Sequence, residues 1–126
     1  MNIVLWILQV LLALAFLAHG WLFLFPPPEI AVLMNASMPR WFQLFLGVAE
    51  VAAGIGLILP GLTRILPQLV AWAADGIVII MVSATVWHFM RGEVSSGFVT
   101  LALLAMATFV AYQRHSVRPI APRRAA

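Results

Sequence analysis

The sequence of 126 residues is long enough for one domain, and its composition is that of a chain surrounded by lipid. Hydrophobic residues make up 64% of it and charged residues only 9%, whereas an ordinary soluble domain is roughly 45–50% apolar and about 25% charged. So few charges exclude a water-soluble surface. The absence of Cys excludes disulfides, thiol catalysis and Cys-based metal or iron–sulfur sites within the chain.

Four apolar runs predict four helices that cross the membrane: Ile3–Phe25, Trp41–Leu59, Ile65–Met90 and Gly97–Tyr112. A helix needs about 20 apolar residues, within a range of roughly 17–25, to cross the hydrocarbon layer. The first run starts close to Met1 with no basic region before it, so we expect a retained span and not a signal peptide. The last run is the shortest, and Arg114 at its end is expected to snorkel toward water.

Prolines and polar residues separate these runs. Pro26–Pro28 is expected to end the first helix and Pro60 the second, because proline lacks a backbone donor and clashes with the preceding turn. Pro67 suits the first turn of the third helix, and a polar turn at Arg91–Ser96 precedes the fourth. The long connection between the first two helices has apolar residues at helical spacing, so it is either a short interfacial helix or an irregular loop. The predicted fold is an all-α antiparallel bundle of four transmembrane helices.

The arginines predict the orientation of this bundle. With four spans both termini lie on one side of the membrane, and most of the seven basic residues fall there: Arg64, Arg114, Arg118, Arg123 and Arg124, against Arg40 and Arg91 on the other side. Because Arg is enriched in cytoplasmic segments, both termini are expected to be cytoplasmic, in the cell membrane. The domain prediction is a transmembrane domain of residues 1–113 and a basic cytoplasmic tail of residues 114–126.

Glu50 lies at the middle of the second run and is the first candidate for a functional residue. At about 100° per residue, it shares one helix face with Gln43, Gly47 and Gly54. Glycines allow a neighbouring helix to approach closely, so this face should turn into the bundle. Burial disfavours the charged form of a carboxyl, so Glu50 is expected to act as a general acid. The other residues of this face, together with Trp72, are candidate substrate contacts.

His19 and Asp75 also lie within apolar runs, and their expected depths place them in one polar centre with Glu50. A charge in lipid costs on the order of 2.5–3.5 kcal/mol, which favours a functional site with Asp75 or a histidine as the base. The alternative is structural, because interhelical hydrogen bonds worth about 0.6–2 kcal/mol often serve only to join helices. His88 is either an interfacial anchor or a further catalytic residue. Thr100 lies on a small-residue face of the fourth helix that is expected only to pack.

Three stretches resemble the DoxX-like family of small four-helix membrane proteins. The longest is Leu46–Leu59, which is similar to the family's second helix in its Gly, its Glu three residues later and the small residues that follow. Ala18–Gly20 resembles the end of the first helix, and Ser83–His88 the end of the third. The resemblance covers roughly residues 8–113. It implies a four-helix membrane fold and implies that Glu50 and His88 occupy positions that the family uses.

Three functions are open at this point. The resemblance implies an accessory or assembly subunit in the membrane. The buried polar residues favour a membrane-embedded enzyme that uses acid–base chemistry to isomerise, cyclise or open an epoxide of a lipophilic small molecule. A proton-coupled small-molecule carrier is the third. We expect no cofactor, because His19 and His88 lie at unmatched depths for a haem, and no metal, because the sequence has no metal-ligand spacing. The expected partners are the lipid bilayer, a lipophilic small molecule, and another membrane protein or a second copy of the chain, but no nucleic acid.

Overall fold

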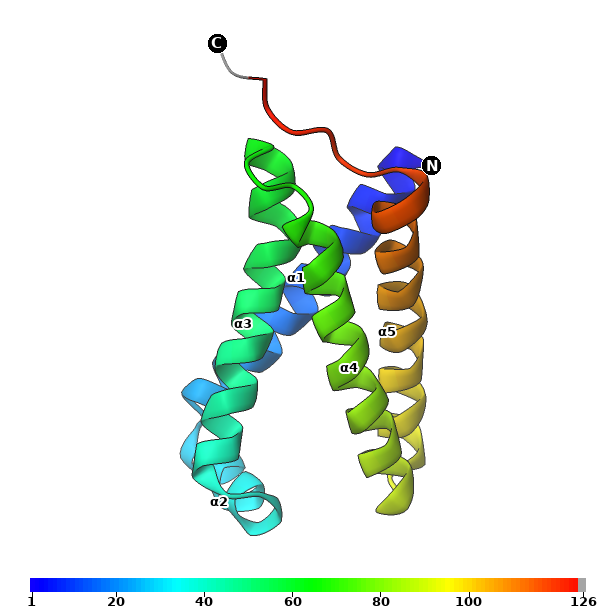
Figure 1. Cartoon of the computed structure of the whole chain (residues 1–126). Coiled ribbons are helices and arrows are strands. Elements are labelled where there is room, and N and C mark those ends of the chain that lie inside the picture. Colours follow the sequence, from blue (N-terminus) through cyan, green and yellow to red (C-terminus); the bar gives the residue numbers. More distant parts are fainter. Residues whose placement is uncertain (125–126) are drawn as a thin grey trace.

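The computed structural model describes residues 1–124, which form helices joined by short turns (Figure 1). The elements are α1 (Asn2–Leu24), α2 (Pro28–Ser37), α3 (Arg40–Thr63), α4 (Leu69–Met90), α5 (Val94–Tyr112) and the π-helical turn η1 (Gln113–Val117). Four stretches are long and apolar enough to cross a membrane: α1, α3, α4, and α5 continued by η1. For the described residues, the prediction of an all-α fold with four membrane-spanning helices is confirmed.

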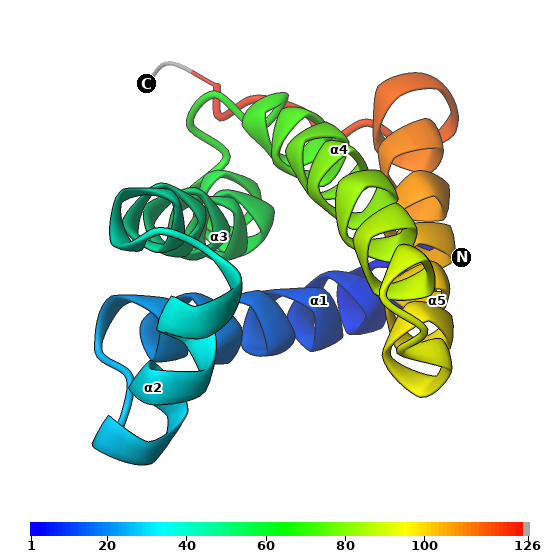
Figure 2. The same cartoon turned by 90° about the horizontal axis from the view of Figure 1, so that it is seen from below.

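The four long helices form two close pairs. α1 packs mainly against α3, and α4 mainly against α5, while α3 also contacts α4. Seen along the bundle, α1 extends from α3 toward α5 (Figure 2). The start of α1 and the segment that follows η1 lie at one end of the bundle, and α2 lies at the other end (Figure 1). The core between the pairs takes residues from all four helices, among which Leu12, Leu57, Ile77 and Val110 are fully buried.

Glycines bring α1 and α3 together. A Cβ added at Gly20 would lie 2.9 Å from the backbone oxygen of Gly47, and one added at Gly47 would lie 2.8 Å from Leu24 Cγ. A Cβ at Gly54 would lie 2.7 Å from Leu17 Cγ. Close packing at small residues is a main source of helix association in lipid. The glycine face predicted for the second span is therefore the face that α1 covers.

The boundaries of α3 and α4 differ from those that the sequence predicted. The prediction that Pro60 ends the second span is wrong, because α3 continues to Thr63. A proline removes one backbone hydrogen bond, and the residues after it still complete the last turn. α4 begins only at Leu69, since Arg64 and Leu66 before it have positive φ angles of 58° and 49°, outside the right-handed helical region.

The fourth span is longer than predicted. α5 begins at Val94 and is continued by η1 to Val117, which gives a span of 24 residues. Arg114 lies within η1 and is only 4% exposed, so the prediction that it snorkels to water is wrong. Its Nε donates to Gln9 Oε1 of α1 at 2.7 Å. This contact across the bundle holds residues past 113 against the helices, beyond the domain boundary that the sequence predicted.

The connection between α1 and α3 contains the short helix α2, one of the two alternatives that the sequence left open. Arg40 fastens this connection, because its Nη1 and Nη2 donate to the backbone oxygens of Phe23 and Leu24 at 2.7 Å each. These two carbonyls lie at the end of α1, where no helical partner follows. Gln43 Nε2 donates to Asn35 Oδ1 of α2 at 2.9 Å. Together the contacts fix α2 at the end of the bundle opposite the termini.

Candidate functional site

Glu50 of α3 and His19 of α1 form a hydrogen-bonded pair across the seam between these helices. His19 Nδ1 lies 2.8 Å from Glu50 Oε2. The Glu50 side chain is 3% exposed, whereas the His19 side chain is 52% exposed. The predicted inward face of the second span is confirmed, since Gln43, Gly47, Glu50 and Gly54 are all buried. Glu50 is therefore a buried carboxyl group whose hydrogen-bond partner, among the described residues, is His19.

A cavity of about 380 Å³ lies between α1, α4 and the start of α5, and His19 is in its wall. We call it the His19 cavity. The residues that line it are Ala15, Phe16, His19, Met81, Ala84, His88, Ser95, Ser96, Val99, Thr100 and Leu103. Small-molecule sites typically measure about 300–1,000 Å³ and combine an apolar wall with a few polar groups. The His19 cavity has this composition, and two imidazoles are among its polar groups.

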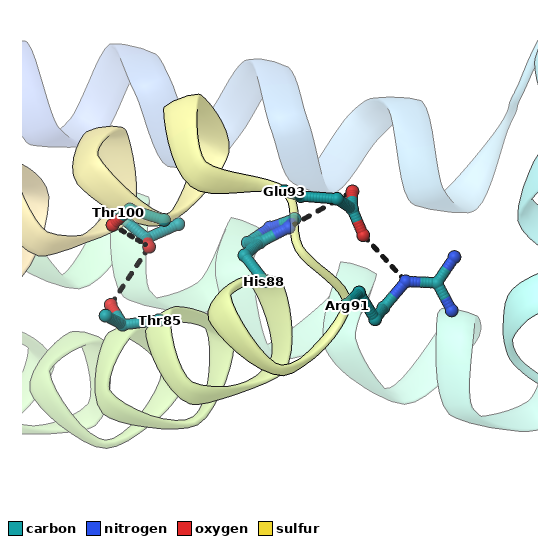
Figure 3. A network of polar contacts seen from close by, with 6 residues as sticks. Thr85, His88, Arg91, Glu93 and Thr100 are labelled. Carbon is teal, nitrogen blue, oxygen red and sulfur yellow. Dashed lines mark hydrogen bonds and ion pairs between the residues drawn. The ribbon is translucent and has the colours of Figure 1, made fainter.

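His88 lines the same cavity and belongs to a polar network at its α4–α5 end (Figure 3). His88 Nδ1 lies 3.5 Å from Glu93 Oε2, and Arg91 Nε donates to Glu93 Oε1 at 2.6 Å. The Arg91 hydrogen bond, with the nearby charges of Arg91 and His88, holds the pKa of Glu93 below its ordinary value of 4.5. The interpretation of His88 as an interfacial anchor is therefore incomplete, because its ring also faces a cavity shared with His19.

Thr100 also lines the His19 cavity, although the sequence predicted that its face would only pack. Its Oγ1 donates to the backbone oxygen of Gly97 at 2.9 Å and lies 2.9 Å from Thr85 Oγ1 (Figure 3). Thr85 Oγ1 is in turn 2.6 Å from the backbone oxygen of Met81. These contacts join α4 to α5 and fix the threonine hydroxyls beside the cavity.

Asp75 has a different partner from the one that the sequence predicted. Its Oδ2 lies 2.7 Å from Nε2 of His115, which η1 supplies. The Asp75 side chain is 49% exposed and that of His115 is 39% exposed. The predicted centre of His19, Glu50 and Asp75 is thus divided into two separate pairs. Within residues 1–124, no group of three or more His, Asp or Glu side chains could hold a metal ion.

The candidate substrate contacts lie outside the lining of the His19 cavity. Gln43 ties α3 to α2, and Gly47 and Gly54 are covered by leucines of α1. Trp72 is 61% exposed and points away from the core. Ser95 and Ser96 line the cavity instead. The sequence predicts a turn at these serines, but α5 begins earlier, at Val94, and brings them to the wall.

Comparison with known proteins shows the family of the chain. The model of the DoxX-like family matches residues 7–110. The match contains His19, Glu50 and His88 and ends before Arg114 and His115. No curated protein and no solved structure matches the chain significantly. The match covers most of the sequence and confirms the resemblance that was based mainly on the glycine-rich second span. The chain therefore belongs to the DoxX-like family of membrane proteins.

Proposed function

We propose that this protein binds a lipophilic small molecule in the His19 cavity and moves a proton to or from it. The observation that carries the proposal is the position of His19, whose ring lines the cavity while a buried carboxyl group bonds its Nδ1 at 2.8 Å. Catalytic histidines commonly have such a partner, which fixes the tautomer and stabilises the imidazolium. The residues that line the cavity belong to the membrane-spanning helices α1, α4 and α5, so its ligand would come from the lipid phase.

The proposed roles follow from which group the ligand can reach. With Nδ1 of His19 bonded to Glu50, the Nε2 atom is the one available to take a proton from the ligand. The imidazolium that forms is stabilised by the carboxylate, and it returns the proton to a different atom of the ligand. Such an isomerisation breaks and forms one C–H bond and shifts one double bond, so it needs no oxidant or reductant. Glu50 lies behind His19 and acts as a positioning residue, not as the direct acid that the sequence predicted.

The chain provides a matched control for a test, because it has two histidine–carboxylate pairs. The probe is androst-5-ene-3,17-dione, a lipophilic β,γ-unsaturated ketone whose isomerisation to the conjugated ketone is followed by ultraviolet absorption. Wild-type protein in phosphatidylcholine vesicles should accelerate this conversion, and His19→Gln should lower the rate by about 10²–10⁴-fold. His115→Gln, which alters the pair outside the cavity, should retain the wild-type rate. Equal rates for His19→Gln and wild type would refute the assignment of the base.

A second candidate function is that of a non-enzymatic membrane subunit. The observation in its favour is the Asp75–His115 pair, which is about half exposed on a surface otherwise rich in apolar side chains. Intramembrane carboxylates normally face a protein interior or pair with another group, and a neighbouring subunit would complete their burial. Asp75→Leu should then weaken a stoichiometric complex seen by native mass spectrometry, while Glu50→Gln should not. A protein that stays monomeric in mild detergent, with full proton-transfer activity, would exclude this role.

A further inference from the structure

Arg114 is the most deeply buried cation of the described chain. It is 4% exposed, and its guanidinium makes three hydrogen bonds to neutral oxygens. Nε donates to Gln9 Oε1 at 2.7 Å, and Nη1 donates to Asn2 Oδ1 and to the backbone oxygen of Arg118 at 2.9 Å each. Gln9 is itself held by Leu57, whose backbone oxygen accepts from Gln9 Nε2 at 2.8 Å. The site is thus built from α1, α3 and η1.

No carboxylate neutralises this charge within residues 1–124. Each of the carboxylates that forms an ion pair there has another partner: His19 for Glu50, His115 for Asp75, and Arg91 with His88 for Glu93. In addition, Arg114 Nη2 is buried and has no hydrogen-bond acceptor among the described residues. Burial of a charge is costly unless it is paired and its donors are satisfied. An anion beside Arg114 would neutralise its charge and would accept a hydrogen bond from Nη2.

A second cavity, of about 600 Å³, is lined by residues that contact Arg114, although Arg114 itself is not part of its wall. We call it the arginine cavity; its wall includes Asn2, Trp6, Arg64 and Arg118. Three of these residues also contact Arg114: Asn2 and Arg118 accept its hydrogen bonds, and the Trp6 ring centroid lies 5.7 Å from its guanidinium carbon. Arg114 therefore stands directly behind the wall of a space that is large enough for a ligand.

The segment after η1 forms one side of the arginine cavity and is fixed there by Arg64. Arg64 Nε donates to the backbone oxygen of Ala121 at 2.8 Å, and the backbone N–H of Arg123 donates to the Arg64 carbonyl at 2.7 Å. Arg118 is exposed and is one of the residues that line the cavity. Arg64 and Arg118 thus line the cavity, and Arg114 lies behind its wall through its contacts with Asn2 and Arg118.

We infer that the arginine cavity binds a phosphate group. A phosphate has three or more acceptor oxygens in a tetrahedral arrangement and can accept from several guanidiniums at once, which a flat carboxylate does less well. Basic pockets at the membrane surface commonly take the phosphate of anionic lipid headgroups, and this cavity lies at the end of the membrane-spanning helices. A free phosphate offers the same oxygens. The site is separate from the His19 cavity, which shares none of its lining residues.

Native mass spectrometry of the full chain in mild detergent tests this inference. The probes are dioleoyl phosphatidic acid and, in a separate arm, inorganic phosphate. Arg118→Gln should weaken binding by about tenfold or more, the effect of losing one charge-assisted hydrogen bond. Arg124→Gln is the matched control, because it removes the same charge from the same end of the chain but does not line the cavity. It should bind within about twofold of wild type.

The two arms distinguish the source of the phosphate. Saturable binding of phosphatidic acid alone supports a lipid headgroup site, and saturable binding of both probes supports a site that also takes free phosphate. Absence of binding in both arms would overturn the inference, and so would equal weakening by Arg118→Gln and Arg124→Gln, which indicates diffuse attraction. Because Arg118 is exposed, this variant should keep the wild-type circular dichroism. Arg114→Gln, if it keeps that spectrum, should abolish binding.

Discussion

Two histidine–carboxylate pairs of nearly equal length lie in very different surroundings in this molecule. The His19–Glu50 distance is 2.8 Å and the His115–Asp75 distance is 2.7 Å. Glu50 is 3% exposed in the glycine-rich seam of α1 and α3, whereas Asp75 is 49% exposed. A Cβ added at Gly76, beside Asp75, would have no atom within 4 Å. The first pair adjoins a cavity, and the second lines neither the His19 cavity nor the arginine cavity.

Since the two hydrogen bonds are nearly equal in length, the burial of the carboxyl group must decide how strongly each pair is held together. A buried carboxylate without its partner would be left unpaired at a high cost, so Glu50 and His19 constrain each other. An exposed pair exchanges its partner for water or a lipid headgroup at little cost, so its contribution to stability is small. Under the proposed function, the same two residue types would transfer a proton in the seam of α1 and α3 and would be available for surface contacts at α4 and η1.

The largest expected effect comes from exchanging each carboxyl group for its amide. Glu50→Gln should lower the rate of androst-5-ene-3,17-dione conversion by about 10²-fold or more, because the amide keeps the shape but no longer stabilises the imidazolium of His19. Asp75→Asn should leave the rate unchanged. Steady-state rates in vesicles, with circular dichroism to confirm the fold, give the measurement. A fully active Glu50→Gln protein would remove the distinction between the two pairs.

Packing around the two pairs should respond differently to one added methyl group. Gly20→Ala places a Cβ 2.9 Å from the backbone oxygen of Gly47 and 3.0 Å from the backbone nitrogen of Val51, and neither backbone atom can move freely. We expect a loss of about 1–3 kcal/mol in the free energy of unfolding. Gly76→Ala enters open space and should stabilise its helix by roughly 0.5–1 kcal/mol. Unfolding in detergent mixtures measures both, and equal effects would show that the seam is no tighter than the outer face of α4.

The coupling within each pair provides a smaller and more direct comparison. In a double-mutant cycle with Asp75→Asn and His115→Gln, the exposed pair should show a coupling of about 0.2–1 kcal/mol in unfolding free energy. The cycle with Glu50→Gln and His19→Gln should give a larger value, because removing one partner leaves a buried group unsatisfied. A coupling at Asp75 as large as that at Glu50 would mean that the exposed pair is buried in the membrane by another chain or by lipid.

The sequence predicted the parts of this structure that depend on local pattern. The four apolar runs correctly predicted four spans. The spacing of four residues also predicted the buried face of α3, because helical periodicity alone determines which residues share a face: Gln43, Gly47, Glu50 and Gly54. The pairing of Glu50 with His19 follows from that face and from the glycines, which select α1 as the neighbouring helix.

The partner of Asp75 and the wall of the cavity could not be predicted in this way. His115 reaches Asp75 because the fourth span continues past Tyr112 through polar residues, and that continuation depends on Arg114 bonding Gln9, which is 105 residues away in the chain. Ser95 and Ser96 reach the cavity wall because α5 begins already at Val94. Neither a long-range contact nor the exact start of a helix leaves a periodic signal in spans that are apolar on every side.

The third histidine–carboxylate contact, between His88 and Glu93, adds a partly exposed pair in the turn between α4 and α5 and carries the smallest effect. Since the pKa of Glu93 is lowered in the folded protein, mainly by Arg91, its ionised form favours folding at pH values above about 4.5. This stabilisation is lost as the pH falls through the lowered pKa. Arg91→Gln should return the pKa toward 4.5, as measured by carbon-13 NMR of the carboxyl group, and Arg124→Gln should not. An unchanged Glu93 pKa in Arg91→Gln would show that Arg91 does not stabilise the ionised form of Glu93. In the wild-type protein, high salt should screen the same interaction and raise the Glu93 pKa part of the way toward 4.5.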